Sequence, residues 1–186
     1  MLNDPNAPEQ QSDGGDTGHA LLACLMEIDR HIDQAGWEQP PLLFALVPTA
    51  ELEAAEPHLA RTELAPPDRL SAIQQDEFDA GDDVVGALAR VMWPDAVVGC
   101  ALSLVRSFLP PDAEADLPDD PAQAETYVQE HPQRQDVRAV VGVLRDGPTQ
   151  GIARLHTHPD DVLSGPDLLP GVVTALAGTF APSGDA

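Results

Sequence analysis

The chain has 186 residues, of which 42% are hydrophobic and 4% aromatic, so it can bury one core built from aliphatic side chains. Nine basic residues stand against 32 acidic ones, which gives a formal net charge of -23. Such a chain is repelled by nucleic acid and by anionic membranes, so neither is expected as a partner. All nine basic residues are arginine, which excludes the lysine of a P-loop, a kinase or a Schiff-base enzyme.

One domain is expected over residues 18–182, between an acidic tail over residues 1–17 and a short tail over residues 183–186. The N-terminal residues lack the basic and apolar regions of a signal peptide, and no apolar run is long enough for a membrane span. The cytoplasm is therefore the expected compartment. Both cysteines lie in apolar segments and form no CxxC motif, so we expect them to be buried free thiols.

The first expected element is an amphipathic helix capped by Asp16 or Thr17. Apolar side chains recur at helical spacing from Leu21 to Ile32, and Gly36 follows as a helix terminator. Asp29 and its charged neighbours fall off this apolar stripe, which is consistent with a helix that buries one side.

Three further elements are predicted before the middle of the chain. The apolar run 42–47, bracketed by prolines, indicates a buried strand, with a Thr49 cap leading into a short helix over residues 50–60. Residues 62–82 are rich in proline and acidic side chains, so we interpret them as an exposed connection. A helix that Asp82 or Asp83 starts is expected next, and it ends at Met92 because Trp93-Pro94 disfavours its continuation.

The second half predicts a strand over residues 97–109, a surface helix over residues 121–131 and a hairpin over residues 137–157. Pro148, directly after the turn residues Asp146-Gly147, indicates a hairpin loop of three or more residues. A last helix is expected to start at Pro166. The order of elements predicts an α+β fold, with an antiparallel sheet of about four strands packed against helices and with acidic surface loops.

One short stretch suggests chemistry. Residues 156–168 read HTHPDDVLSGPDL and resemble the motif of the JAMM (MPN+) metalloproteases, which combine H-x-H-P with a later S-x-x-D and an upstream glutamate. The resemblance implies zinc held by His156, His158 and Asp167, with an open position for water. A distant glutamate would then act as general base and Ser164 would stabilise the oxyanion.

The spacing of this stretch favours a different interpretation. The spacer before Ser164 is shorter than is usual in that family, and no upstream segment carries its glutamate pattern. Residues 164–167 are also a typical helix start, with a capping serine, a proline and an early acidic side chain. We therefore interpret the stretch as the end of the hairpin followed by a helix cap, and assign no catalytic, cofactor-binding or metal-binding residue.

Longer segments carry a broader resemblance. WEQPPLLFALV, WPDAVVGCALSLVRSFLPP, HPQRQDVRAVVGVLRDG and VLSGPDLLPGVVTAL resemble, in this order, a family of small conserved actinobacterial proteins of unknown function. The resemblance covers most of residues 36–180 and implies a cytoplasmic actinobacterial protein with no assigned activity. Members of that family usually carry no histidine pair at the HTHP position, so the resemblance transfers no catalytic residue.

Two tryptophans beside prolines, Trp37 and Trp93, offer candidate anchors for an interface, but tryptophan at such an element boundary is more often the edge of a core. Together with the absence of a nucleophile–base arrangement, they favour a small non-enzymatic binding or interaction module whose partner is another protein. A partner with clustered arginines would match the acidic loops. The alternative is a JAMM-like zinc isopeptidase. Nothing in the sequence points to an oligomeric state.

Overall fold

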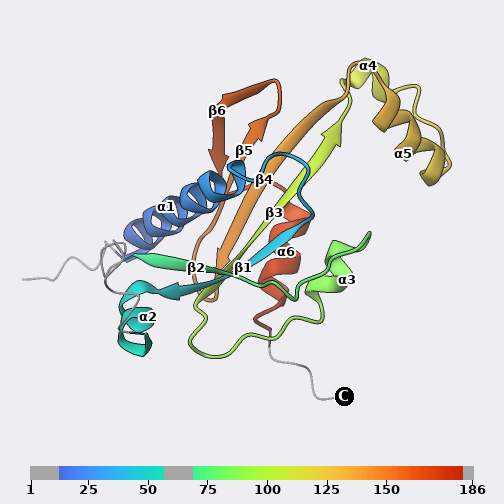
Figure 1. Ribbon diagram of the computed structural model, residues 1–186. Coiled ribbons are helices and arrows are strands. Elements are labelled where there is room, and N and C mark those ends of the chain that lie inside the picture. Colours follow the sequence, from blue (N-terminus) through green and yellow to red (C-terminus); the bar gives the residue numbers. More distant parts are fainter. Residues whose placement is uncertain (1–12, 57–68, 182–186) are drawn as a thin grey trace, which may run out of the picture.

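The computed structural model describes residues 13–56 and 69–181 (Figure 1). Within these residues, six strands form one antiparallel sheet in the order β2-β1-β3-β4-β5-β6. The strands are β1 Leu42–Pro48, β2 Leu70–Gln74, β3 Gly99–Phe108, β4 Gln135–Leu144, β5 Thr149–Leu155 and β6 His158–Gly165. The helices are α1 Asp13–Asp33, α2 Thr49–Ala55, α3 Val84–Leu88, α4 Pro111–Glu114, α5 Pro121–Glu130 and α6 Pro170–Gly178.

The α+β class and the antiparallel sheet are confirmed, but the expected number of about four strands is wrong. The four predicted strands are β1, β3, β4 and β5, which form the centre of the sheet. The two strands that the sequence did not indicate, β2 and β6, are its edges. Neither edge strand has a fully buried side chain, so neither carries the apolar run or clean alternation that marks a buried strand.

Helix α1 covers one face of the sheet, against β4 and β5 (Figure 1). Its predicted apolar stripe meets side chains from four strands in one cluster: Leu21, Cys24, Leu25, Ile28, Ile32, Phe44, Leu46, Ala101, Val140 and Ile152. The close approach depends on Gly142 in β4, because a Cβ atom there would lie 2.8 Å from Cδ2 of Leu25. The sheet and the helix are therefore in direct contact at this point.

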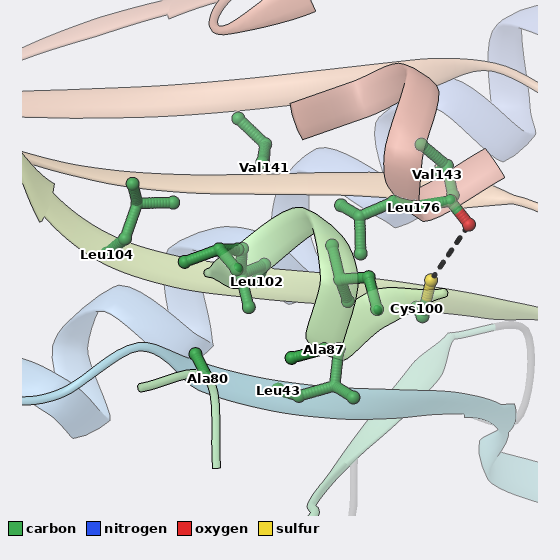
Figure 2. Close-up of a cluster of buried hydrophobic side chains, with 11 residues drawn as sticks. Leu43, Ala80, Ala87, Cys100, Leu102, Leu104, Val141, Val143 and Leu176 are labelled. Carbon is green, nitrogen blue, oxygen red and sulfur yellow. Dashed lines mark hydrogen bonds between the residues drawn. The ribbon is translucent and has the colours of Figure 1, made fainter. Parts of the chain in front are cut away.

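Helices α3 and α6 cover the opposite face, over a second cluster that Figure 2 shows. It contains Leu43, Ala80, Val84, Ala87, Leu88, Cys100, Leu102, Leu104, Val141, Val143 and Leu176. The Cys100 thiol points toward the carbonyl oxygen of Leu176, 3.8 Å away, where α6 packs over β3 (Figure 2). Successive residues of β4 thus alternate between the two cores, as the predicted strand pattern requires.

Several helix boundaries differ from the predictions. Helix α6 begins at Pro170 rather than Pro166, with Leu169 before it at a φ of 51° and without a side-chain cap. The capping residue of α2 is Pro48, and Thr49 is its first helical residue. Helix α3 covers only Val84–Leu88 of the range expected to residue 92. Helix α5 agrees with its prediction, since Asp120 accepts hydrogen bonds from the backbone at its start.

The expected tails and the long connection lie partly outside the described residues. Helix α1 starts at Asp13, so residues 13–17 are helical, whereas residues 1–12 and 183–186 lie outside the described residues. The segment interpreted as an exposed connection, residues 62–82, contains β2, and its residues 62–68 also lie outside the description. Among the helices of the described ranges, none is long and apolar enough to cross a membrane.

The packing of α1 predicts a difference between neighbouring helix positions. Leu25 is fully buried against β4, whereas Met26 is 40% exposed. We expect Leu25→Ala to lower the free energy of unfolding by about 2–5 kcal/mol, because it leaves a cavity in the core. Met26→Ala should change it by no more than about 0.5 kcal/mol. Denaturant unfolding monitored by circular dichroism measures both, and equal losses would contradict this placement of α1.

Candidate functional site

The two histidines of the HTHP stretch lie at the hairpin between β5 and β6. His156 occupies the turn itself, where its backbone N–H donates to the Asp136 carbonyl oxygen at 2.8 Å. Its ring meets the indole of Trp37 edge-on, with ring centroids 4.7 Å apart. His158 begins β6, and its Nδ1 lies 3.0 Å from the Thr157 hydroxyl oxygen. Both rings thus have neighbours at the turn.

Asp167 lies beyond the opposite end of β6 from these histidines. Strand β6 runs from His158, which pairs with Leu155, to Gly165, which pairs with Gly151, so its two ends are four β5 residues apart, or roughly 13 Å. The structure therefore does not bring together the three residues that the metalloprotease resemblance names. No group of three or more histidine, cysteine or acidic side chains in the described ranges is placed to hold a metal ion.

Ser164 and Gly165 belong to β6 and not to a helix start, so the predicted cap at this position is wrong. Ser164 pairs with Ile152 and Gly165 with Gly151 in the β5–β6 ladder. Sequence reasoning favoured a helix cap because serine, proline and aspartate follow one another there. The backbone instead stays extended to Gly165 and turns before Pro170.

Four charged side chains form a cluster between α1 and the sheet, which we call the arginine–aspartate cluster: Asp29, Asp33, Arg138 and Arg154. Arg138 in β4 is 1% exposed and Asp29 in α1 is 2% exposed. Arg138 donates to Asp29 Oδ1 from Nε at 3.3 Å and to Asp33 Oδ1 from Nη2 at 2.8 Å. Arg154 in β5 donates from Nε to Asp29 Oδ2 at 2.6 Å.

These contacts leave Asp29 no free carboxylate oxygen, since each oxygen accepts from a different arginine. Trp37 lies against the other side of Arg138, with the guanidinium carbon 4.8 Å from the ring centroid. Arg138 Nη1 is buried without a hydrogen-bond acceptor, and the negative π face of Trp37 stabilises this cation in its place. The cluster pairs two carboxylates with two guanidinium groups and ties α1 to β4 and β5.

Asp29 was expected to lie off the apolar stripe of α1, and that prediction is wrong, because its side chain is buried. The sequence of β4 does contain an indication that Asp29 is buried. Arg138 shares its strand face with Val140 and Gly142, whose positions point toward α1. A charged residue in such a buried register requires an opposite charge from the helix that covers it.

On the opposite face of the sheet, β1, β2 and the segment 75–97 enclose a hollow of about 540 Å³, which we call the groove. Its lining is mainly apolar: Leu43, Ala45, Val47, Ile73, Phe78, Ala87, Val91, Met92, Trp93, Pro94 and Val97. The polar side chains at its wall are Gln75, Glu77, Asp79 and Arg90. Ile73 is 39% exposed and Met92 78% exposed, so large apolar side chains reach solvent here.

Trp93 forms a fixed wall of the groove. Its indole N–H donates to the Thr179 hydroxyl at 2.8 Å, and its ring stacks on Phe180 with centroids 6.3 Å apart. A second hollow of about 660 Å³ lies on the other side of the residues 90–93. Of the two tryptophans considered as anchors, Trp93 lines a surface hollow, whereas Trp37 covers Arg138.

Both cysteines are free and buried, as predicted. Burial raises the pKa of Cys24 to about 12, and the nearby Glu27 charge adds to this effect. Burial likewise raises the pKa of Cys100 to about 12, although hydrogen bonds with Thr179 and Trp93 oppose it. Because the folded protein favours the neutral thiols, their contribution to stability is present below pH 9.0 and is lost as the pH rises toward about 12.

We expect neither thiol to react with a disulfide reagent in the native protein at about pH 8, because the thiolate is the reactive form. Unfolding in guanidinium chloride should release two equivalents of reactive thiol, one from each cysteine. Stoichiometric reaction of either cysteine without denaturant would contradict its burial.

The arginine–aspartate cluster predicts unequal roles for its two carboxylates. Asp29→Ala leaves two arginines without their shared acceptor, and we expect it to cost about 3–5 kcal/mol of unfolding free energy. Asp33 has a side chain that is 60% exposed, so Asp33→Ala should cost about 1 kcal/mol or less. Denaturant titration of both variants, with Asp29→Asn as a milder form, measures the difference. Similar losses at both positions would show that Asp29 is not the centre of the cluster.

No curated protein and no solved structure matches the chain. The family model of the PPA1309-like proteins does match it, over residues 21–181, which run from Leu21 within α1 to three residues past the end of α6. The match therefore includes the whole sheet, the arginine–aspartate cluster and the groove. This chain belongs to the PPA1309-like protein family.

Proposed function

We propose that this chain is a non-enzymatic interaction module that binds another protein through the groove. The observation that carries the proposal is an apolar hollow with a fixed tryptophan wall and large apolar side chains exposed at its mouth. Aromatic and methionine side chains around a concavity are enriched at protein interfaces. Residues 90–93 separate two hollows, so a partner can place an apolar side chain on either side of this segment.

Charge indicates the kind of partner. Glu77 and Asp79 line the groove, and the whole chain carries a formal net charge of -23. A partner segment with an apolar anchor flanked by lysine or arginine matches this surface, whereas an acidic segment is repelled. Arg90 is the one cationic side chain of the groove lining and repels a basic partner. Its replacement therefore tests whether the partner is basic.

The lining of the groove supports binding rather than catalysis. Its polar side chains are one amide, two carboxylates and one guanidinium, without a serine, cysteine or histidine beside them. Such a set offers no nucleophile with an adjacent base. We place the module in the cytoplasm, where two free cysteines are kept reduced. The zinc isopeptidase alternative has no comparable support, because β6 separates His158 from Asp167.

The test begins with capture from a native cytoplasmic extract and ends with purified components. Three baits are used: the wild-type protein, Met92→Asp and the matched control Met26→Asp. The two variants introduce the same negative charge on opposite sides of the sheet. A partner lost by Met92→Asp and retained by Met26→Asp is purified and titrated by calorimetry. We expect Met92→Asp to weaken its binding at least about tenfold, or 1.4 kcal/mol, because it places a carboxylate against an apolar anchor.

Charge reversal provides the second measurement. Arg90→Glu should strengthen binding to the purified partner, and binding of the wild-type protein should weaken as NaCl rises. A partner that binds Met92→Asp and Met26→Asp equally would exclude the groove. A partner that loses affinity on Arg90→Glu would contradict the basic character proposed here.

A further inference from the structure

The hollow of about 660 Å³ on the other side of residues 90–93 lies where the segment after α3 meets the end of α6. We call it the Trp93–Phe180 hollow, after the two rings in its wall. Its charged lining side chains are Arg90 and Arg145, and among the described residues no acidic side chain lines it. The whole chain has 32 acidic residues against nine basic ones, so this hollow has the opposite charge from the protein around it.

Neither arginine is neutralised by a carboxylate in contact with it. Every ion pair within the described ranges uses a different arginine. Asp95 and Asp146 line a neighbouring hollow that Arg145 also borders, but neither of them pairs with it. Both guanidinium groups are therefore free to bind an anion from solution.

Arg145, directly after β4, is held in place by the backbone that precedes β3. Its Nη2 donates to the carbonyl oxygens of Pro94 at 3.2 Å and of Val97 at 3.1 Å. Its guanidinium carbon lies 4.7 Å from the centroid of the Phe180 ring. In the part of the chain that the structure describes, Nη1 has no acceptor. A guanidinium fixed in this way loses little conformational freedom when it binds a ligand.

The end of α6 borders the hollow and carries a partial negative charge, equivalent to about half an elementary charge when its carbonyl groups are free. Here these groups are bonded, because the backbone N–H groups of residues 179–181 donate to the carbonyl oxygens of residues 176–178. The Thr179 hydroxyl is also engaged, since it donates to the Leu176 carbonyl oxygen and accepts from Trp93. The two full charges of the arginines therefore outweigh the helix end.

We propose that the Trp93–Phe180 hollow binds a small-molecule carboxylate that carries an apolar or aromatic body. Arg90 and Nη1 of Arg145 donate to the carboxylate, and the body lies against the rings of Trp93 and Phe180. The volume of the hollow is that of a small-molecule site. A phosphate monoester has close to two negative charges and is disfavoured, because the net charge of -23 repels it more strongly than a carboxylate.

This proposal goes beyond the groove and does not depend on it, because the ligand is a small molecule and binding needs no partner protein. Residues 90–93 line both hollows. Of the two, Arg145 and Phe180 line only the Trp93–Phe180 hollow, whereas Ile73 lines only the groove. Ile73→Asp should therefore weaken binding of a protein partner and leave carboxylate binding unchanged.

Titration of the purified full chain with phenylacetate, followed by the amide resonances in two-dimensional NMR, tests the proposal. We expect saturable binding with a dissociation constant of roughly 1 mM or lower at about 0.05 M NaCl, and weaker binding at about 0.5 M NaCl. The shifts should be largest in residues 89–93 and 178–181. Phenylacetamide, which has the same ring without the charge, should bind at least about tenfold more weakly. Inorganic phosphate should also bind more weakly than phenylacetate.

Substitution of single arginines separates the site from the total charge. Arg90→Gln and the matched control Arg106→Gln each remove one positive charge, and Arg106 is exposed on β3, outside the hollow. Arg90→Gln should raise the dissociation constant for phenylacetate at least about fivefold, whereas Arg106→Gln should stay within about twofold. Arg145→Lys should also raise it at least about fivefold, because lysine keeps the charge but lacks the planar donor fork.

Absence of binding up to about 10 mM phenylacetate at low salt would overturn the proposal. Equal binding of phenylacetamide would show an apolar hollow without anion recognition, and tighter binding of phosphate would exclude the carboxylate class. Equal effects of Arg90→Gln and Arg106→Gln would exclude this hollow as the site. Loss of phenylacetate binding in Ile73→Asp would place the ligand in the groove instead, so failure of this site and failure of the groove are distinguishable.

Discussion

The arrangement of this protein depends on one buried carboxylate, that of Asp29, held between two arginines from neighbouring strands. Arg138 occupies one carboxylate oxygen and Arg154 the other, so a single side chain of α1 fixes the helix to β4 and β5 at once. Buried ions are costly to desolvate, and the set is stable only while it is complete. The apolar stripe of α1 allows the helix to lie on the sheet, whereas the charge contacts determine where it lies along the strands. The same arginine of β5 also holds the edge strand β6, because Arg154 donates to the Pro159 carbonyl oxygen at 2.6 Å.

The sequence predicted those helices and strands that are marked by a local pattern of residues within them or directly beside them. The central strands and the α5 cap were identified because apolar alternation, aspartate and proline act over a few residues. The edge strands β2 and β6 were missed because each is stabilised by backbone pairing with one neighbouring strand. Such pairing does not require a particular residue pattern, so it cannot be recognised in a single sequence. Asp29 was misplaced for a related reason, since the arginine that holds it lies 109 residues away along the chain. The groove was equally hidden, because β1, β2 and residues 75–97 meet only in the folded protein.

The excess of acidic residues acts differently in the interior and at the surface. In the core, Asp29 is matched by arginines and contributes to the position of α1. At the surface, the unmatched carboxylates make the protein repel anionic partners and other copies of itself at low salt. The groove and the β6 edge are two places where exposed apolar side chains oppose this repulsion. At the groove, where we propose that a partner binds, specificity should come from the balance of apolar contact and charge rather than from apolar area alone.

The HTHPDDVLSG stretch shows why a short motif is decided by the path of the backbone. Two histidines and a later aspartate form a metal site only if the chain folds back between them. Here the chain runs along β5 from His158 to Gly165, with an irregularity between His158 and Val162, and His156 packs against Trp37 at the turn. Val162 and Leu163 then lie on the two faces of an edge strand, and neither side chain has an atom that can bind a metal ion. The same ten residues that resemble a catalytic signature are, in the folded protein, a hairpin turn followed by the edge strand of the sheet.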